Sequence, residues 1–381
     1  MPRLPQRRRG NQLKIKERPL PYSFWPVYQG SHRIGLQSSV FALDPWTIIN
    51  SSIRRRCPAV AQKEAHACIE QAKDFYQASI SAHIAAAKPL LLYYCFLNIV
   101  KAFALTVGQQ TTYDKAEHGL GEGLTNPPGR ELLDAYLSSF QSPNSRRKLQ
   151  VFDEFYKALT TQGLSSDLRL TLPKLMPQIL AGHRLWAAAA ETEERFLAMH
   201  EIRMMVDERN KTVWINLYFF ADDLARLDVT VRRLITESGL SGLFRQVTSD
   251  RKEAGRKLIC LEQISVRSYR HRPSDIVGVL VRDIKYKLWT AVASVQPYRR
   301  YYLYLAPLSE HSEILPQLLS IYTIMYYLGS ITRYRPHHFD SILIGTFGPR
   351  IEEFITGQPL QFIYLMASEF AQQDVVRPSI V

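Results

Sequence analysis

The sequence predicts an α+β fold in which a mainly helical bundle carries a β-rich central module, with carboxy-terminal helices that pack back on the bundle. Three observations predict it. Stretches with helical composition fill the first half, short alternating apolar stretches begin after Met199, and helical patterns return near the end. We therefore expect a basic arm over residues 1–45, a helical domain over 46–199, a β-rich module over 200–310 and a helical region over 311–381.

The composition is that of a folded chain. Of its 381 residues, 46% are hydrophobic and 22% are charged, which argues against a largely disordered, collagen-like or coiled-coil protein. Lys and Arg number 48 against 35 Asp and Glu, and the net charge of +13 favours polyanionic partners such as RNA or DNA. The four cysteines form no Cys-x-x-Cys pair, so we expect neither a zinc site nor a disulfide scaffold.

The amino-terminal segment is strongly basic. Residues 1–18 carry seven Lys or Arg against a single acid, Glu17. The resulting positive surplus of this segment is nearly half of the net charge of the chain. We expect a mobile arm that either contacts phosphates or is simply a solvated terminus. The segment lacks the apolar stretch of a secretory signal, so a cytoplasmic location is expected.

The helices of the first half follow from composition and from proline. Residues 59–87 are rich in Ala, Gln, Glu and Lys without Gly or Pro, and they predict one long helix. Residues 89–107 form an apolar helix whose first turn suits Pro89. Asn98 and Lys101 near its middle would be costly in lipid, so we expect a buried core helix and no membrane partner. Further helices are predicted over residues 131–140, 148–160 and 178–199.

The central module reads as strands. Alternating apolar residues around a Glu-Arg-Asn-Lys turn predict a hairpin over residues 201–220, and a helix over residues 222–237 follows, with Gly239 as its stop. Further strands are predicted over residues 242–247, 257–266, 276–291 and 301–306, and final helices over 314–334 and 360–373.

Three polar side chains share one stripe of the apolar helix. Tyr94, Asn98 and Lys101 follow the spacing i, i+4, i+7, which places them on one face. Buried amides and ammonium groups need partners, and His118 in the next segment is available in sequence. The stripe is either a structural polar network or part of a ligand or catalytic site.

The same segment carries a family resemblance. PLLLYYCFLNIVKAFAL followed by EHGL resembles the signature of the YaaC-like family, which has a Pro-Leu-Leu, Tyr-Tyr, Asn and Lys-Ala pattern and a later His-Gly. YYLGSITRYRP and the final PLQFIYLMASEF helix are similar to the later part of that family, so the resemblance extends along most of the chain. It implies a layout of helices and middle strands, and no reaction.

A more distant resemblance is to HEPN domains, which are nucleotide-binding helical bundles, and it implies a HEPN-like bundle here. Many active members are metal-independent ribonucleases with an Arg-x4-6-His motif, and several act as homodimers. Arg333 and His338 match that spacing, so the resemblance implies this pair as catalytic, without metal or cofactor. An arginine can hold phosphate oxygens while a histidine exchanges the 2′-hydroxyl proton. Alternatively, Arg333 is a helix-end cation, and Pro336 should end that helix near Arg335.

Basic and aromatic residues also alternate in two other stretches, VRSYRHRP and PYRRYYLYL. At neighbouring strand ends, the arginines would hold phosphates while the tyrosines stack on unpaired bases; the alternative is ordinary edge-strand chemistry. With the arginine that follows the long late helix, the candidate nucleic-acid contacts are Arg270, Arg272, Arg299, Arg300, Tyr301 and Arg335.

Three functions therefore stay open. The first is a module that binds nucleic acid or a protein partner, in bacterial stress or anti-phage defence; the second is the ribonuclease; the third is a structural subunit of a larger complex. The sequence has no phosphate loop, dinucleotide fingerprint, zinc-protease motif or nucleophile elbow. His337, His338 and Asp340 are too few for a usual metal site.

Overall fold

The computed structural model describes residues 4–15, 17–25, 39–82, 85–108, 110–125, 132–143, 148–285, 290–295 and 298–378. The chain forms two compact units. The sheet unit combines Met1–Phe41, Glu194–His311 and Gln372–Val381, and the helical unit combines Ala42–Glu193 with Ser312–Ala371. The early and late helices thus fold together, and the predicted α+β fold is confirmed.

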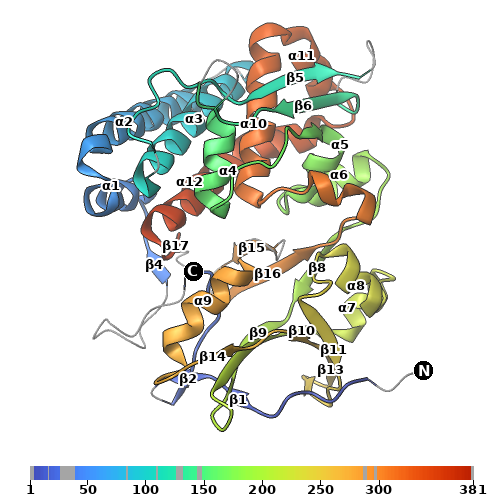
Figure 1. Cartoon of the computed structure of the whole chain (residues 1–381). Helices are drawn as coiled ribbons and strands as arrows, with labels where there is room; N and C mark the ends of the chain where they lie inside the picture. The colour runs from blue at the N-terminus through green and yellow to red at the C-terminus, as the bar shows by residue number, and fades with distance from the viewer. Residues whose placement is uncertain are drawn as a thin grey trace. The chain divides into compact units, whose positions relative to one another are not determined.

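The helical unit is a bundle with one small sheet (Figure 1). Its sheet has the antiparallel order β5-β6-β7. Its elements are α1 Pro45–Arg56, α2 Ala59–Ser81, η1 Ala85–Ala87, α3 Lys88–Val107, β5 Leu120–Leu124, β6 Ala135–Ser139, α4 Val151–Thr160, β7 Arg169–Thr171, α5 Leu172–Leu175, η2 Met176–Gln178, α6 His183–Ala189, α10 Gln317–Tyr334, α11 Pro336–Ile344 and α12 Gly348–Ala371.

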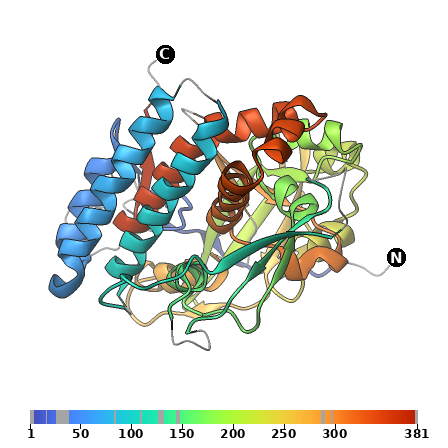
Figure 2. The ribbon, with the colours of Figure 1, turned by 90° about the horizontal axis from the view of Figure 1, so that it is seen from above.

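The core of this unit is α3, which packs against α2, α10 and α12 (Figure 2). Phe96 of α3 stacks on Phe362 of α12, with ring centroids 3.9 Å apart, and Phe103 packs edge-on against Phe370 at 5.2 Å. Within the described residues, α3 alone is long and apolar enough to cross a membrane, and 72% of its most apolar window is buried. It is a core helix, as its polar residues predict.

The sheet unit is built on an antiparallel sheet in the order β1-β9-β10-β13-β11. Smaller sheets pair β15 with β16 and β8, β4 with β17, and β2 with β3. Its elements are β1 Asn11–Gln12, β2 Lys14–Ile15, β3 Arg18–Pro19, β4 Ser39–Phe41, β8 Phe196–Met199, β9 Glu201–Asp207, β10 Thr212–Phe220, α7 Ala221–Arg226, α8 Val231–Glu237, β11 Phe244–Val247, β12 Lys252–Glu253, β13 Arg256–Gln263, β14 Arg267–Ser268, α9 Ser274–Ile284, β15 Thr290–Val295, β16 Tyr298–Tyr304 and β17 Asp374–Val376, and η3 Leu308–Glu313 follows β16.

The alternation of side chains along β10 decides which face of the sheet is the core. Ile215, Leu217 and Phe219 point into an apolar cluster that also receives residues of α7, α8 and α9. Asn216 and Tyr218 lie on the opposite face, where Asn216 is paired in register with Glu262 of β13. The predicted hairpin over residues 201–220 is confirmed as β9 and β10.

The amino-terminal arm is part of the sheet unit. Strand β1 pairs with β9, and Leu13 is 1% exposed within the apolar cluster. The backbone N–H of Arg8 donates to Oε2 of Glu262 at 2.9 Å, and its guanidinium donates to the Ile264 carbonyl. The described residues 4–15 and 17–25 are thus anchored to the sheet unit at Leu13 and Arg8, while most of their side chains stay exposed to solvent, as a solvated arm predicts. Residues 1–3 and 16 lie outside the described residues.

Four predicted elements differ from the structure. The single helix predicted over residues 222–237 is divided into α7 and α8. Residues 276–291 were expected as a strand, but α9 covers Ser274–Ile284 because Val277, Leu280, Val281 and Ile284 form one buried helical face. Residues 131–140 were expected as a helix, but β6 alternates buried and half-buried residues between β5 and β7. The helix predicted over residues 178–199 is confined to α6, and β8 follows it.

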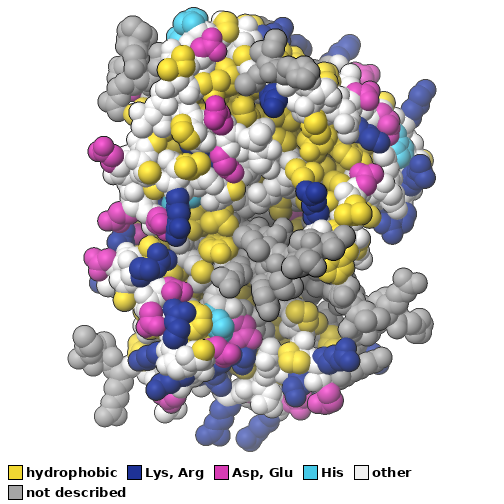
Figure 3. All heavy atoms as spheres, turned by 180° about the vertical axis from the view of Figure 1, so that it is seen from behind, with side chains coloured by type: hydrophobic (Ala, Val, Ile, Leu, Met, Phe, Trp, Pro, Cys, Tyr) yellow, Lys and Arg dark blue, Asp and Glu magenta, His cyan; other side chains and the backbone are white. Residues whose placement is uncertain are grey.

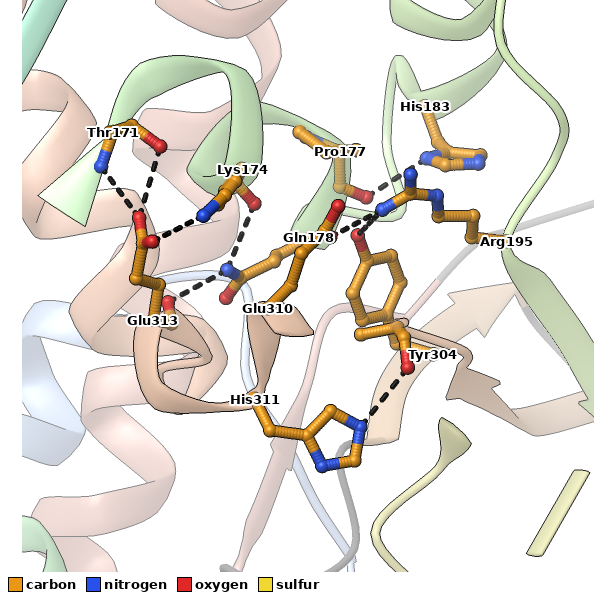
Figure 4. A network of polar contacts seen from close by, with 11 residues as sticks. Thr171, Lys174, Pro177, Gln178, His183, Arg195, Tyr304, Glu310, His311 and Glu313 are labelled. Atoms are coloured by element: carbon orange, nitrogen blue, oxygen red, sulfur yellow. Dashed lines mark hydrogen bonds and ion pairs between the residues drawn. The ribbon is translucent and has the colours of Figure 1, made fainter. Parts of the chain in front are cut away.

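Each unit holds its own part of the segment Leu308–Glu313 with ion pairs (Figure 4). In the helical unit, Glu313 accepts from Lys174 Nζ at 2.5 Å and from the N–H and hydroxyl of Thr171, both at 3.0 Å. In the sheet unit, Arg195 lies 2.6 Å from Oε2 of Glu310 and also donates to the Tyr304 hydroxyl at 3.3 Å. Both acids are therefore fixed within their own unit.

Candidate functional site

The polar stripe of α3 lies on one face of the helix, as its spacing predicts. Asn98 is 7% exposed, and its Nδ2 donates to Oε1 of Gln71 on α2 at 2.9 Å. The Tyr94 ring stacks on Phe75 of α2 with centroids 5.5 Å apart. Lys101 differs from these residues, because it forms no hydrogen bond or ion pair with any other described residue. Part of the stripe is therefore a satisfied network, and its last member is a cation without a partner in the described part of the chain.

His118 is held by the backbone at the start of α4. The N–H of Val151 donates to the Glu117 carbonyl at 2.9 Å, and that of Phe152 donates to the His118 carbonyl at 3.2 Å. Gly119 adopts a φ of +78°, and a Cβ there would lie 2.9 Å from the Phe152 nitrogen. Only glycine fits this turn, so the His-Gly pair has a structural reason.

The imidazole of His118 lies against the buried Tyr93 of α3. Their hydroxyl oxygen and Nδ1 are 2.5 Å apart. Burial, and next the neighbouring Tyr322 and Tyr326, raise the pKa of Tyr93 well above its ordinary value, so its hydroxyl keeps its proton. A neutral imidazole that accepts this proton at Nδ1 carries its own proton at Nε2. Among the described residues, Nε2 has no hydrogen-bond partner.

A close helix approach brings α10 to the same place. A Cβ on Gly329 would lie 2.9 Å from the Tyr93 Cβ, so no larger residue allows α10 this near to α3. One turn earlier, Tyr326 packs edge-on against the Tyr93 ring, with centroids 5.2 Å apart. One turn later, Arg333 donates from Nη1 to the Tyr94 hydroxyl at 3.2 Å.

Lys101, His118 and Arg333 together form what we call the cationic cluster. Partial burial, and next the charges of Lys101 and Arg333, lower the pKa of His118, while Glu117 opposes them. Glu117 itself is paired with Lys148, 2.9 Å away. Within the described part of the chain, no carboxylate forms an ion pair with Lys101 or Arg333. Two positive charges therefore act on the imidazole of His118, and positive charge of this kind favours an anionic partner.

The neighbouring Arg335 differs from Arg333 in its ion pairing. Its guanidinium forms an ion pair with Glu122 of β5, and burial lowers its pKa. It ends α10, and Pro336 begins α11, as the sequence predicts. His338 lies in the first turn of α11, with its ring edge-on to His337 at 4.3 Å. Arg333 and His338 thus lie on consecutive helices.

The structure does not place the candidate nucleic-acid contacts of the sheet unit together in one site. Arg270 and Arg272 are exposed between β14 and α9, whereas the side chains of Arg299 and Arg300 in β16 lie outside the described residues. Tyr301 is 9% exposed and packs edge-on against the Tyr22 ring at 5.6 Å, so it belongs to the core. On the face drawn in Figure 3, Lys and Arg side chains are interspersed with Asp and Glu.

Sequence reasoning did not assign Tyr93, Gly119 and Gly329 their roles in positioning His118 and Arg333. Tyr93 is adjacent to the stripe residue Tyr94, and helical spacing gives no reason to pair it with His118. The glycines had weak signals, a His-Gly pair and a glycine within an aromatic helix face, but sequence does not show which backbone approaches them. Among the described residues, no group of three or more His, Cys, Asp or Glu is placed to hold a metal ion.

Comparison with known proteins gives one match. A family model described as YaaC-like Protein matches residues 40–370, which include all of the helical unit from α1 to α11 and the cationic cluster. No curated protein and no solved structure matches the chain.

Proposed function

This chain belongs to the YaaC-like protein family, and we propose that it binds single-stranded nucleic acid through the cationic cluster of its helical unit. The observation that carries the proposal is that Arg333 donates to Tyr94 of α3 next to the Tyr93–His118 contact, and that the charges of Lys101 and Arg333, neither of them ion-paired with a carboxylate among the described residues, both act on His118. Lysine and arginine side chains bind the phosphate groups of a nucleic-acid backbone through charge-assisted hydrogen bonds. The net charge of +13 also favours a polyanionic partner.

An exposed aromatic ring beside the cluster favours a single strand. Tyr334 is 66% exposed, and the Arg333 guanidinium carbon lies 4.9 Å from the centroid of its ring. An unpaired base can stack on such a ring while the arginine holds the adjacent phosphate. We place this binding in the cytoplasm, because the basic amino-terminal segment lacks the apolar stretch of a secretory signal. A role in bacterial stress or anti-phage defence is supported by the HEPN resemblance of the sequence.

The test is a titration of the full chain with a labelled single-stranded RNA, followed by fluorescence anisotropy at several salt concentrations. We expect binding that weakens steeply with salt, and a slope of log K against log salt that falls by about 0.7 for each phosphate contact removed. The double variant Lys101→Gln/Arg333→Gln should lose most of the binding while its circular dichroism spectrum stays unchanged. A folded wild-type chain that does not bind RNA or DNA at low salt would overturn the proposal.

The ribonuclease alternative is tested on the same samples. RNA incubated in EDTA and then resolved on a denaturing gel would be cleaved by the wild type, and not by Arg333→Gln or His338→Ala. Binding without cleavage leaves the binding module alone. If the chain neither binds nor cleaves, the structural-subunit alternative is the one that stands.

A further inference from the structure

We propose that the helical unit contains a second binding site, a cavity between the ends of α3 and α4 that takes a small organic molecule through its primary ammonium group. The cavity shares no residue with the cationic cluster, and binding there does not depend on the proposed function. Three features support this site: the cavity itself, a buried carboxylate at its inner end, and the two helix ends that surround it.

The cavity has a volume of about 140 Å³ and is partly open to the solvent. It is lined by the last turn of α3, by the last two turns of α4 and by Tyr113, which follows α3. Ala104, Val107 and Ala158 give it apolar walls, and the exposed residues Val107 and Thr161 lie at its mouth. A water molecule needs about 10–15 Å³ of such space, so the cavity has room for roughly ten non-hydrogen atoms.

Glu154 places a carboxylate at the inner end of the cavity. The residue is only 6% exposed, yet it forms no ion pair with any described residue. The Tyr113 hydroxyl donates to Oε2 at 3.5 Å, which is at the long limit of a hydrogen bond. Among the described residues, no side chain or backbone N–H donates to Oε1. Because a buried carboxylate without a cation is costly, this side chain suits a positively charged ligand.

Two helix C-termini meet at the same cavity. Helix α3 ends at Val107 and α4, which packs against it, ends at Thr160 (Figure 1). The C-terminus of a helix carries a partial negative charge, which favours a cation beside it. Glu64 of α2 adds a second carboxylate nearby, because its Oε1 accepts from the Tyr113 N–H at 2.8 Å. The surroundings therefore add to the attraction of the Glu154 carboxylate for a cation.

An amine fits this chemistry better than a metal ion. Metal ions take several ligands, and among the described residues no group of three or more His, Cys, Asp or Glu is placed to hold one. A primary ammonium group has three donors and can bind both oxygens of Glu154, while a short alkyl chain covers Ala104 and Ala158.

Lys157 narrows the class of amine. It also lines the cavity, three residues after Glu154 on α4, and it forms no ion pair with any carboxylate in the described ranges. Its charge would repel a second ammonium group on the ligand. The site therefore favours a monoamine over a diamine of the same length.

The experiment titrates the full chain with butylamine, butane-1,4-diamine and butan-1-ol, which have the same carbon chain, and follows binding by saturation-transfer NMR and by the melting temperature. Butylamine should raise the melting temperature and should bind about tenfold more tightly than butan-1-ol, because the alcohol lacks the charge-assisted contact. The diamine should bind more weakly than butylamine. Butylamine that binds no better than butan-1-ol would overturn the site, and a diamine that binds more tightly than butylamine would overturn the assigned preference.

Two variants separate the carboxylate from the cavity. Glu154→Gln keeps the shape of the side chain and removes its charge, so butylamine binding should fall about tenfold, and the melting temperature without amine should stay the same or rise, because no described cation loses a partner. Ala158→Leu keeps the charge and fills the cavity, so it should also abolish binding.

Glu352→Gln is the matched control, because it makes the same change at an exposed glutamate of α12 in the same unit, and it should leave butylamine binding unchanged. If Glu154→Gln and Ala158→Leu both fold and still bind butylamine like the wild type, the amine binds elsewhere and the proposal is wrong. A lower melting temperature of Glu154→Gln with unchanged binding would assign Glu154 to structure alone and would also overturn it.

Discussion

The hydroxyl of Tyr93 lies 2.5 Å from Nδ1 of His118, and this contact joins the buried core of α3 to the exposed cationic cluster. Tyr93 is 5% exposed and packs against tyrosines of α10, while His118 is exposed just before β5. The imidazole is thereby fixed in position by a residue that does not itself face the solvent.

The pH dependence of stability should report on His118. Its pKa is lowered in the folded state from an ordinary value of 6.5, so the unfolded chain takes up a proton more readily. His118 therefore has no effect well above pH 6.5, and it lowers the free energy of unfolding as the pH falls below that value. Urea titrations at pH 7.5 and 5.5 should show a smaller acid-induced loss in His118→Gln than in the wild type. An equal or larger loss in the variant would contradict the assignment.

Gly119 should not tolerate a side chain. Its φ of +78° is a backbone conformation that alanine rarely adopts. An added Cβ would also lie only 2.9 Å from the Phe152 nitrogen. We expect Gly119→Ala to cost about 2–4 kcal/mol in the free energy of unfolding, from backbone strain and overpacking together. Gly255→Ala is the matched control, since Gly255 has the same φ of +78° with no atom within 4 Å of its Cβ position, and it should cost only about 1 kcal/mol. If thermal melts showed the same decrease in melting temperature for the two variants, the proposed packing against Phe152 would be contradicted.

Gly329 should control both packing and binding. A methyl group at this position meets the Tyr93 Cβ at 2.9 Å and the Pro89 carbonyl at 3.2 Å, so α10 must move away from α3. Gly329→Ala should cost about 1–3 kcal/mol and should also weaken RNA binding, because Arg333 lies one turn further along α10. Ser330→Ala, at the next position of the same helix, should change stability by less than about 0.5 kcal/mol and leave binding unchanged. Anisotropy titrations together with urea unfolding separate the two effects.

The two arginines at the end of α10 should behave in opposite ways. Arg333 has no ion-paired carboxylate among the described residues, so Arg333→Gln should weaken RNA binding and lower the salt slope by about 0.7 without a change in stability. Arg335 is paired with Glu122, whose side chain is 15% exposed, so Arg335→Gln should cost about 1–3 kcal/mol and leave binding intact. Loss of binding in Arg335→Gln at full stability would show that its charge, too, reaches the nucleic acid.

Glu313 should be a strong structural anchor. Its carboxylate is 14% exposed and accepts hydrogen bonds from Lys174 and from two donors of Thr171, so Glu313→Ala leaves an ammonium group and a backbone N–H without their partner. The expected cost is about 3 kcal/mol in the free energy of unfolding. Glu352→Ala, at an exposed position of α12, is the control and should have little effect. A cost below about 1 kcal/mol for Glu313→Ala would contradict the anchor.

Secondary structure was predictable where local signals agree. Pro89 lies in the first turn of α3 and Pro336 begins α11, positions where the missing proline N–H costs nothing, and the alternation in β9 and β10 predicted the hairpin. The prediction failed for α9, where β-branched residues suggested a strand although Val277, Leu280, Val281 and Ile284 follow helical spacing. It also failed for β6, where helix-forming residues are held in a sheet by β5 and β7.

The sequence by itself determined the α+β class, the apolar helix with its stripe of Tyr94, Asn98 and Lys101, and the family, because each depends on spacing or composition within one segment. The tertiary structure alone decided that Lys101, His118 and Arg333 act on one region, since they come from segments more than 200 positions apart at the extremes. It also decided that Arg335 is ion-paired with Glu122, whereas no described carboxylate is ion-paired with Arg333. The physical reason is that charge pairing depends on distances in space, which here are set by the close approach of α10 to α3 at Gly329.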